Sequence, residues 1–311
     1  MKLCNAGAVQ LLIVTLATLA ACGGDEAAPT SGSTAAGRVG VVLGTANNPE
    51  LRQLEGSVRK ALEQRDQELV VQSANDDLAR QAQLVRTFAS QGARAIVVAP
   101  LDSASLRPVL DAAAQRRIPV FTLALPVHGA RVTTHMETDY TAVGVAAAEY
   151  IGAFLGPRLR AAVVGNVGAH GTREMESAFR ARMTSVAGRV VSGTGDGEGT
   201  REGAAAATRA LLARDRNLDA IFAMDPASAM GAVDAAEAAR RTDLVIVGFG
   251  SNPEVLQAIA GTSPLHAAIV PRFDEGARLL AEAIVTDLEG EPVTASIRVP
   301  VRIVAGDSAR R

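Results

Sequence analysis

Three dipeptides in the sequence pair a helix-capping side chain with a proline directly after an apolar run: Asn48-Pro49, Asp225-Pro226 and Asn252-Pro253. The amide or carboxylate accepts hydrogen bonds from the first N–H groups of a helix, and proline suits the first helical position. In open α/β sheets, ligands lie beyond the carboxyl ends of the strands, where helix N-termini also point. These turns are therefore candidate ligand contacts, and a purely capping role stays open for each.

Other residue patterns give no sign of catalysis. The four histidines, at positions 128, 135, 170 and 266, show no metal-ligand spacing, and no nucleophile–base pair stands out. The glycine-rich loop 193–200 lacks the lysine of a phosphate loop and the spacing of a calcium loop. Residues 164–171 do not match a dinucleotide fingerprint, which leaves Asn166 and His170 as ligand candidates. We expect neither an enzyme nor a bound metal or cofactor.

Composition narrows the class of partner. The 311 residues carry a formal net charge of −2 and are 48% hydrophobic, so the chain offers no long basic surface for nucleic acid. Aromatic residues make up 3% of the chain, so stacking platforms for bases or sugars are scarce. The length has room for two domains with their own cores.

The N-terminus is predicted to be a targeting segment. Residues 1–21 form a short apolar leader that ends in Leu19-Ala20-Ala21, followed by Cys22. Small residues before a cysteine are typical of a bacterial lipobox, where cleavage leaves that cysteine as the lipid-modified N-terminus. Ordinary signal cleavage near Ala21 is the alternative. Residues 22–37 then form a flexible tether, and we expect a periplasmic or envelope protein, anchored by Cys22 to the outer membrane.

Short β-branched runs alternate with stretches of helical period from residue 38 onward. The first series has strands at 38–43, 68–72, 94–99 and 118–122, with helices over 49–65, 77–91 and 103–116. A helix over about 140–155 precedes strands at 160–165, 188–192, 218–223 and 243–249. The chain then has an apolar run at 265–270, a helix over 273–288 and a strand near 294–304. Two such series predict two doubly wound α/β domains with parallel sheets.

Several of these segments resemble one known family. Val41–Pro49 is similar to the first strand and turn of periplasmic ribose-binding proteins, a family that includes lactose-repressor-type sensor domains. Ala95–Pro100, Ile118–Leu123, Leu218–Ala223, Ala229–Ala232 and Val245–Phe249 match later segments of that family in the same order. The resemblance covers about residues 38–305.

This resemblance implies two Rossmann-like lobes joined by a three-segment hinge, the type I periplasmic binding protein fold. It places 38–138 and 271–292 in the N-terminal lobe, and 139–270 and 293–305 in the C-terminal lobe. Such proteins deliver a small solute to the permease of an ABC-type importer. A sensor that presents the solute to a membrane receptor, and a member that has lost binding, are alternatives that stay open.

The chain departs from the sugar-binding members at the positions that hold hydroxyl groups. Glu50 and Leu51 stand where phenylalanine is usual, and Asp225 replaces an asparagine. Because a site that discriminates through hydroxyls needs those buried polar partners, we expect a small solute other than a common free sugar. The residues carried over as ligand-binding candidates, each polar one of which could instead be a cap, a rim residue or part of a hinge ion pair, are Thr45, Asn48, Glu50, Leu51, Leu125, Arg173, Met175, Asp225, Phe249, Ser251 and Arg272.

Overall fold

The computed structural model describes residues 37–306, apart from the side chains of Pro49 and Glu50. The predicted leader, Cys22 and nearly all of the predicted tether lie outside the described residues. The described chain forms two sheets of six strands each, and this confirms the predicted two-lobed α/β fold.

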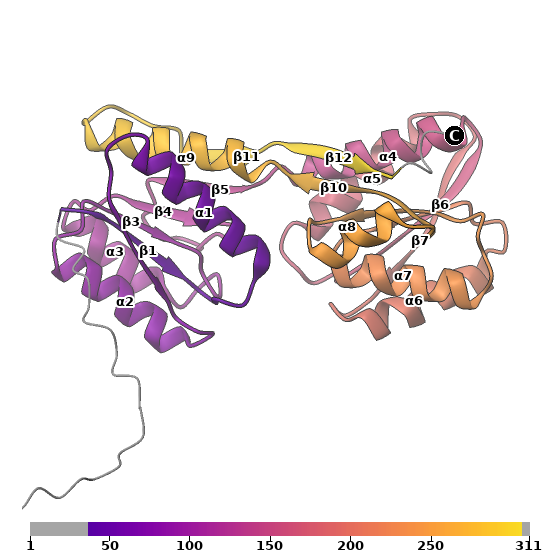
Figure 1. Ribbon diagram of the computed structural model, residues 1–311, viewed down its shortest axis with the longest axis horizontal. Helices are drawn as coiled ribbons and strands as arrows, with labels where there is room; N and C mark the ends of the chain where they lie inside the picture. The colour runs from indigo at the N-terminus through magenta and orange to yellow at the C-terminus, as the bar shows by residue number, and fades with distance from the viewer. Residues whose placement is uncertain (1–36, 307–311) are drawn as a thin grey trace, which may run out of the picture. The chain divides into compact units, whose positions relative to one another are not determined.

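The first lobe is a parallel sheet with strand order β11-β5-β4-β3-β1-β2. Its elements are β1 (Val39–Leu43), α1 (Pro49–Glu63), β2 (Leu69–Ser73), α2 (Leu78–Ser90), β3 (Ala95–Val98), α3 (Arg107–Gln115), β4 (Val120–Leu123), β5 (Thr134–Thr138), α9 (Phe273–Leu288) and β11 (Ser296–Val299). Late segments of the chain thus complete this lobe: α9 packs beside α1, and β11 pairs with β5 (Figure 1).

The second lobe has strand order β12-β10-β9-β8-β6-β7, in which only the edge strand β12 runs antiparallel to its neighbour. Its elements are α4 (Tyr140–Leu155), β6 (Leu159–Gly165), α5 (Thr172–Thr184), β7 (Arg189–Asp196), α6 (Arg201–Arg214), β8 (Ala220–Ala223), α7 (Pro226–Ala238), β9 (Val245–Phe249), α8 (Pro253–Ala260), β10 (Leu265–Pro271) and β12 (Val301–Ala305).

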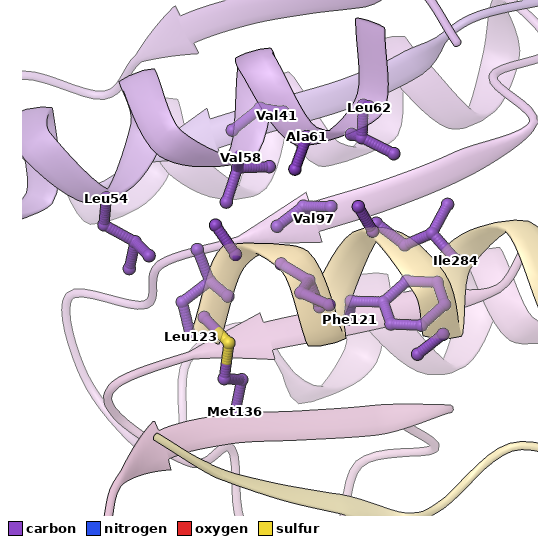
Figure 2. Close-up of a cluster of buried hydrophobic side chains, with 14 of the residues drawn as sticks. Val41, Leu54, Val58, Ala61, Leu62, Val97, Phe121, Leu123, Met136 and Ile284 are labelled. Carbon is purple, nitrogen blue, oxygen red and sulfur yellow. The ribbon is translucent and has the colours of Figure 1, made fainter. Parts of the chain in front are cut away.

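Each sheet has helices on both faces because its central strands carry apolar side chains on both faces. In β1, Val41 lies in the core between the sheet and helices α1 and α9, whereas Val42 faces the core beneath α2 and α3. Figure 2 shows the first of these cores, where Val58 and Leu62 of α1 meet Val97 of β3 and Ile284 of α9. Burying one such side chain contributes about 1.5–3 kcal/mol, so the alternation of faces fixes the register of each strand.

The chain passes between the lobes at Asp139, Arg272 and Pro300, each of which separates an element of one sheet from an element of the other. The three crossings are joined by backbone hydrogen bonds. Asp139 N donates to Val299 O at 3.0 Å, and Arg272 N donates to Pro300 O at 2.8 Å. The lobes therefore share a three-segment hinge held together by its own backbone.

Two details differ from the expected organisation. The single strand expected near 294–304 is two strands separated by Pro300, and β11 belongs to the first sheet. The pairing of β11 with β5 therefore contradicts, for β11, the assignment of residues 293–305 to the C-terminal lobe. Proline lacks the N–H of a continuous ladder, which is why the strand divides there. The strand β5 was also not expected, since Thr-His-Met-Glu-Thr has too little apolar content.

Candidate functional site

The strand order of the second lobe contains a reversal between β6 and β8. The chain runs from β6 outward to β7 and then returns to the other side of β6. Ligands of open α/β sheets bind beyond the strand ends at such a reversal. Asp225 is two residues beyond the end of β8, and Asn166 directly follows β6. Asp225 Oδ2 accepts from the backbone N of Asn166 at 3.2 Å and so connects the two strand ends at the reversal.

A cavity of about 740 Å³ lies at these strand ends. Met224 and Met175 supply apolar lining, and the side chains of Tyr140 and Phe249 meet edge-to-face with ring centroids 6.3 Å apart. The other lining residues come from helix N-termini and strand-end loops: Asn48, Asn166, Ala169, His170, Thr172, Gly199, Arg201, Asp225, Pro226, Ala227, Met230, Asn252 and Glu254. The cavity has the size of a small-molecule site.

The three capping dipeptides all reach this cavity, and their side chains also cap helices. Asp225 Oδ1 accepts from Ser228 N at 2.8 Å, and Asn252 Oδ1 accepts from Val255 N at 2.9 Å. Asn48 Oδ1 accepts from Leu51 N at 3.3 Å. These side chains therefore cap helices and line the cavity at once. Both follow from topology, because a helix that begins just after a strand has its N-terminus beside the cavity at the strand ends.

Charged groups of the cavity wall are bound to one another. The Arg201 guanidinium donates from Nε and Nη2 to Asp234 at 2.6 and 2.7 Å, and from Nη1 to Glu254 at 2.5 Å. The hydrogen bonds that Arg201 donates to Asp234 raise the pKa of Arg201 and lower the pKa of the Asp234 carboxyl. Because the three residues lie on α6, α7 and α8, this network ties together the helices around the cavity.

Four of the eleven residues carried over as ligand-binding candidates line this cavity, namely Asn48, Met175, Asp225 and Phe249. Asn166 and His170, the candidates from residues 164–171, line it as well. Arg173 lines a neighbouring cavity of about 850 Å³, which shares Ala169 and His170 with the first. These positions fit the expectation that the candidates gather at strand ends, and their binding role stays a prediction.

The other expected residues are absent from the described lining of both cavities. Thr45 Oγ1 accepts from Asn47 N at 3.1 Å, and Leu51 packs against the core of the first lobe. Arg272 is exposed at a hinge crossing. Leu125 and Ser251 are half-buried outside the lining, and the side chain of Glu50 lies outside the described part of the chain.

Three of the lining residues, Tyr140, Arg201 and Glu254, were not expected from the sequence. Tyr140 opens an alanine-rich helix directly after the capping residue Asp139, and an aromatic residue at a helix start is a signal that could have found it. Arg201 and Glu254 carry no such signal, since their meeting depends on three helices that are distant in sequence.

A second polar cluster lies where the two lobes approach the hinge. Glu137 Oε2 accepts from His170 Nε2 at 2.6 Å and lies 3.5 Å from His135 Nε2, while Glu137 Oε1 is 3.0 Å from Arg298 Nη1. Burial is the main cause that lowers the pKa of His135, and the nearby Glu137 carboxylate opposes it. The histidines are 35 residues apart and one stands on the unexpected strand β5, so their spacing in the sequence gave no indication of this cluster.

Two α/β lobes, three hinge crossings and a small-molecule cavity at the strand ends define the class of two-lobed solute-binding proteins. The sequence matches the periplasmic binding protein domain family over residues 39–292, and the chain belongs to this family. The expected resemblance is thereby confirmed. Proteins of this family are substrate-binding proteins of transporters.

Individual relatives extend over almost the whole chain. The ribose import binding protein RbsB of Bacillus subtilis (strain 168) is 26% identical over 298 residues, which cover 94% of this chain and 96% of that protein. The arabinose-binding protein AraP of Geobacillus stearothermophilus superimposes with a TM-score of 0.82 at 14% identity, covering 88% of this chain and 98% of AraP. The periplasmic ribose ABC transporter structure from Conexibacter woesei DSM 14684 gives 0.80 at 21% identity, covering 90% and 96%.

Proposed function

We propose that this protein captures a small solute in the 740 Å³ cavity of its second lobe and delivers it to the permease of an ABC-type importer. Family membership and the names of the ribose and arabinose relatives support delivery to an importer. The observation that carries the binding site is the convergence of four sequence-predicted candidates on the cavity at the strand reversal.

The solute we propose is not a common free sugar. The carboxylates of Asp225 and Glu254 are bound internally, the first to Ser228 and Asn166, the second to Arg201. A carboxylate that is already engaged contributes less to a ligand hydroxyl than a free one, whereas the rings of Tyr140 and Phe249 and three methionines favour an apolar face. The cavity therefore suits a molecule with an apolar face and a few hydrogen-bond acceptors, such as a modified sugar.

The Asn166 and Asn252 amides support that preference for acceptors. Asn166 Oδ1 accepts from Gly168 N at 3.2 Å, and Asn252 Oδ1 accepts from Val255 N at 2.9 Å. With the amide oxygens engaged by backbone N–H groups, the amide NH₂ ends are the groups with which these side chains can meet a ligand. Two such donors on the wall match a carbonyl, carboxylate or ether oxygen better than a ring of hydroxyls.

A thermal-shift panel tests the proposed ligand class. D-Ribose, D-glucose, D-galactose and D-xylose at millimolar concentration should leave the melting temperature unchanged. A bound ligand at 100 times its Kd would stabilise the protein by ~2.7 kcal/mol, which such an assay resolves. A clear shift with any of the four, absent in Asp225→Ala, would restore a plain sugar-binding assignment.

We also propose that Cys22 carries a lipid that holds the protein at the cell envelope, on the outer membrane. The Leu19-Ala20-Ala21-Cys22 sequence supports this, and the family points to the periplasm or envelope. None of the helices within residues 37–306 is both long enough and apolar enough to cross a membrane. The variant Cys22→Ser should leave the membrane fraction, with Cys4→Ser as its matched control. A wild-type protein recovered in soluble form with a free N-terminal amine would contradict the proposal.

A further inference from the structure

The polar cluster near the hinge, formed by His135, Glu137, His170 and Arg298, contains the residue types of a metal site. His135 and Glu137 stand on β5 of the first lobe, and His170 lies in the loop between β6 and α5 of the second. One ligand atom from each, two imidazole nitrogens and a carboxylate oxygen, lies within 4.8 Å of the other two. Two histidines with one carboxylate are a zinc ligand set that leaves a fourth position for water.

Two of the three separations between the ligand atoms can be compared with those of a zinc site, and the third, between the two histidines, is no more than 4.8 Å. Ligands 2.0–2.1 Å from a tetrahedral ion are separated by about 3.3 Å from one another. His135 Nε2 and Glu137 Oε2 are 3.5 Å apart, close to that value. His170 Nε2 is closer, at 2.6 Å, and its side chain is 36% exposed, so the ring has room to withdraw. The ion would replace the hydrogen between His170 Nε2 and Glu137 Oε2, and the His170 ring would then carry its proton on Nδ1.

The groups behind the ligands are already arranged for a metal. Thr122 Oγ1, on a side chain that is 1% exposed, lies 2.9 Å from His135 Nδ1, and in the Nδ1–H tautomer this bond leaves the Nε2 lone pair toward Glu137. His135 Nε2 is buried and has no hydrogen-bond partner among the described residues. A buried nitrogen without a partner is costly, and a metal ion would satisfy it.

Arg298 occupies the far side of the carboxylate. Its Nη1 lies 3.0 Å from Glu137 Oε1, whereas both histidines face Oε2. Glu174 lies 3.5 Å from the same guanidinium nitrogen and offsets part of its positive charge. Arg298 therefore orients the carboxylate and leaves Oε2 available, as outer groups of metal sites do.

We propose that His135, Glu137 and His170 bind one Zn²⁺ ion, which connects the two lobes at their hinge. The proposal goes beyond solute capture and does not depend on the identity of the solute. Because the ligands come from both lobes, bound zinc stabilises their association and restricts hinge motion. Ca²⁺ and Mg²⁺ prefer oxygen ligands, so they should not compete for the two imidazoles.

Isothermal titration with ZnCl₂ tests the site on the full chain carrying Cys4→Ser and Cys22→Ser, which removes both thiols as competing ligands. One ion should bind per chain. His135→Ala and His170→Ala should each weaken binding by at least about 100-fold, and Thr122→Val by about 10-fold, as loss of an outer group does. His128→Ala is the matched control and should bind zinc like the parent.

Two further readouts separate metal binding from loss of folding. His170 is exposed, so His170→Ala should still fold, and its melting temperature should fail to show the zinc-dependent increase that the parent shows. Co²⁺ should give the visible absorption of a low-symmetry site in the parent and not in this variant. Equal zinc affinity in the parent, His135→Ala and His170→Ala, or no 1:1 binding in the parent, would overturn the proposal.

Discussion

The two lobes share one fold, but different side chains lie at their strand reversals. In the first lobe the reversal lies between β1 and β3, where the fully buried Gln81 bonds to Ala99 O at 2.8 Å and accepts from Leu101 N at 3.0 Å. In the second lobe the corresponding reversal lies between β6 and β8, where Asp225 joins the two strand-end loops and a cavity opens. Among the described lining residues of that cavity, Asn48 alone comes from the first lobe.

On the proposed function, the doubly wound fold provides two candidate sites, and the side chains at each strand reversal decide which one receives the solute. A glutamine that satisfies two backbone groups closes one strand end, because those groups then need no ligand. A carboxylate that joins two strand-end loops leaves the space beyond them to a solute. We therefore expect comparable substitutions in the two lobes to have unequal effects on stability and ligand binding.

The largest effect should come from a glycine packed under the cavity. A Cβ on Gly144 of α4 would lie 2.2 Å from Met175 O and 2.8 Å from Phe179 N, both backbone atoms of α5. Gly144→Ala should therefore force the helices apart and lower the free energy of unfolding by about 3 kcal/mol in urea titrations. Gly56→Ala in α1 of the first lobe meets nothing within 4 Å and should raise it by about 0.5–1 kcal/mol. The same sign for both variants would contradict this packing.

The next effect should come from the closed reversal. Gln81→Leu leaves Ala99 O and Leu101 N without their side-chain partner and should lower the free energy of unfolding by about 2 kcal/mol. Ligand affinity should stay unchanged, because Gln81 is outside the described lining of the cavity. A variant that folds normally but binds its solute less tightly would place the first-lobe reversal in the site.

Substitution of a capping residue should have a larger effect on stability in the second lobe than in the first. Asp225→Ala removes bonds to Ser228 N, Ser228 Oγ and Asn166 N, and should cost about 1–2 kcal/mol of stability together with ligand affinity. Asn48→Ala removes a 3.3 Å bond to Leu51 N from an exposed side chain and should cost about 0.5 kcal/mol, the low end for a capping residue. Equal losses of stability in urea titrations would remove the distinction between the two lobes.

The smallest effect should be a pH dependence. Burial lowers the pKa of His266 in β10, whose Nδ1 has no partner among the described residues, and of His135 in β5. Below about pH 6.5 the unfolded chain takes up protons that these rings resist, so stability should fall as the pH drops from 7 to 5. His266→Gln should reduce that fall, leaving the part due to His135. An unchanged pH profile would show that the second-lobe histidine does not contribute.

Much of the fold was predictable because helices and buried parallel strands carry strong periodic signals. The strand β5 was missed because Thr134, His135 and Glu137 give it polar character, and it is stabilised by pairing with β4 and β11 on either side. Its partner β11 lies far along the chain, and a local pattern holds no information about such a contact. The boundary between β11 and β12 at Pro300 follows from one proline and was open to prediction.

The site was predictable where local chemistry and topology coincide. Asp225 and Asn252 signalled helix starts after strands, and the fold brings such starts together at one edge. The internal pairing of Arg201 with Asp234 and Glu254 depends on the packing of three helices, which no spacing in the sequence expresses. The same reason hid the meeting of His135 with His170.

Native mass spectrometry of the protein purified from its own cell envelope tests the central claim most directly, with two matched tryptophan substitutions. Ala227 lines the second-lobe cavity, whereas Ala46 is exposed at the end of the first-lobe strand β1. The wild type and Ala46→Trp should retain a small molecule whose mass is not that of a free pentose or hexose, and Ala227→Trp should lose it. Retention by Ala227→Trp, or the mass of an unmodified pentose or hexose, would contradict the account.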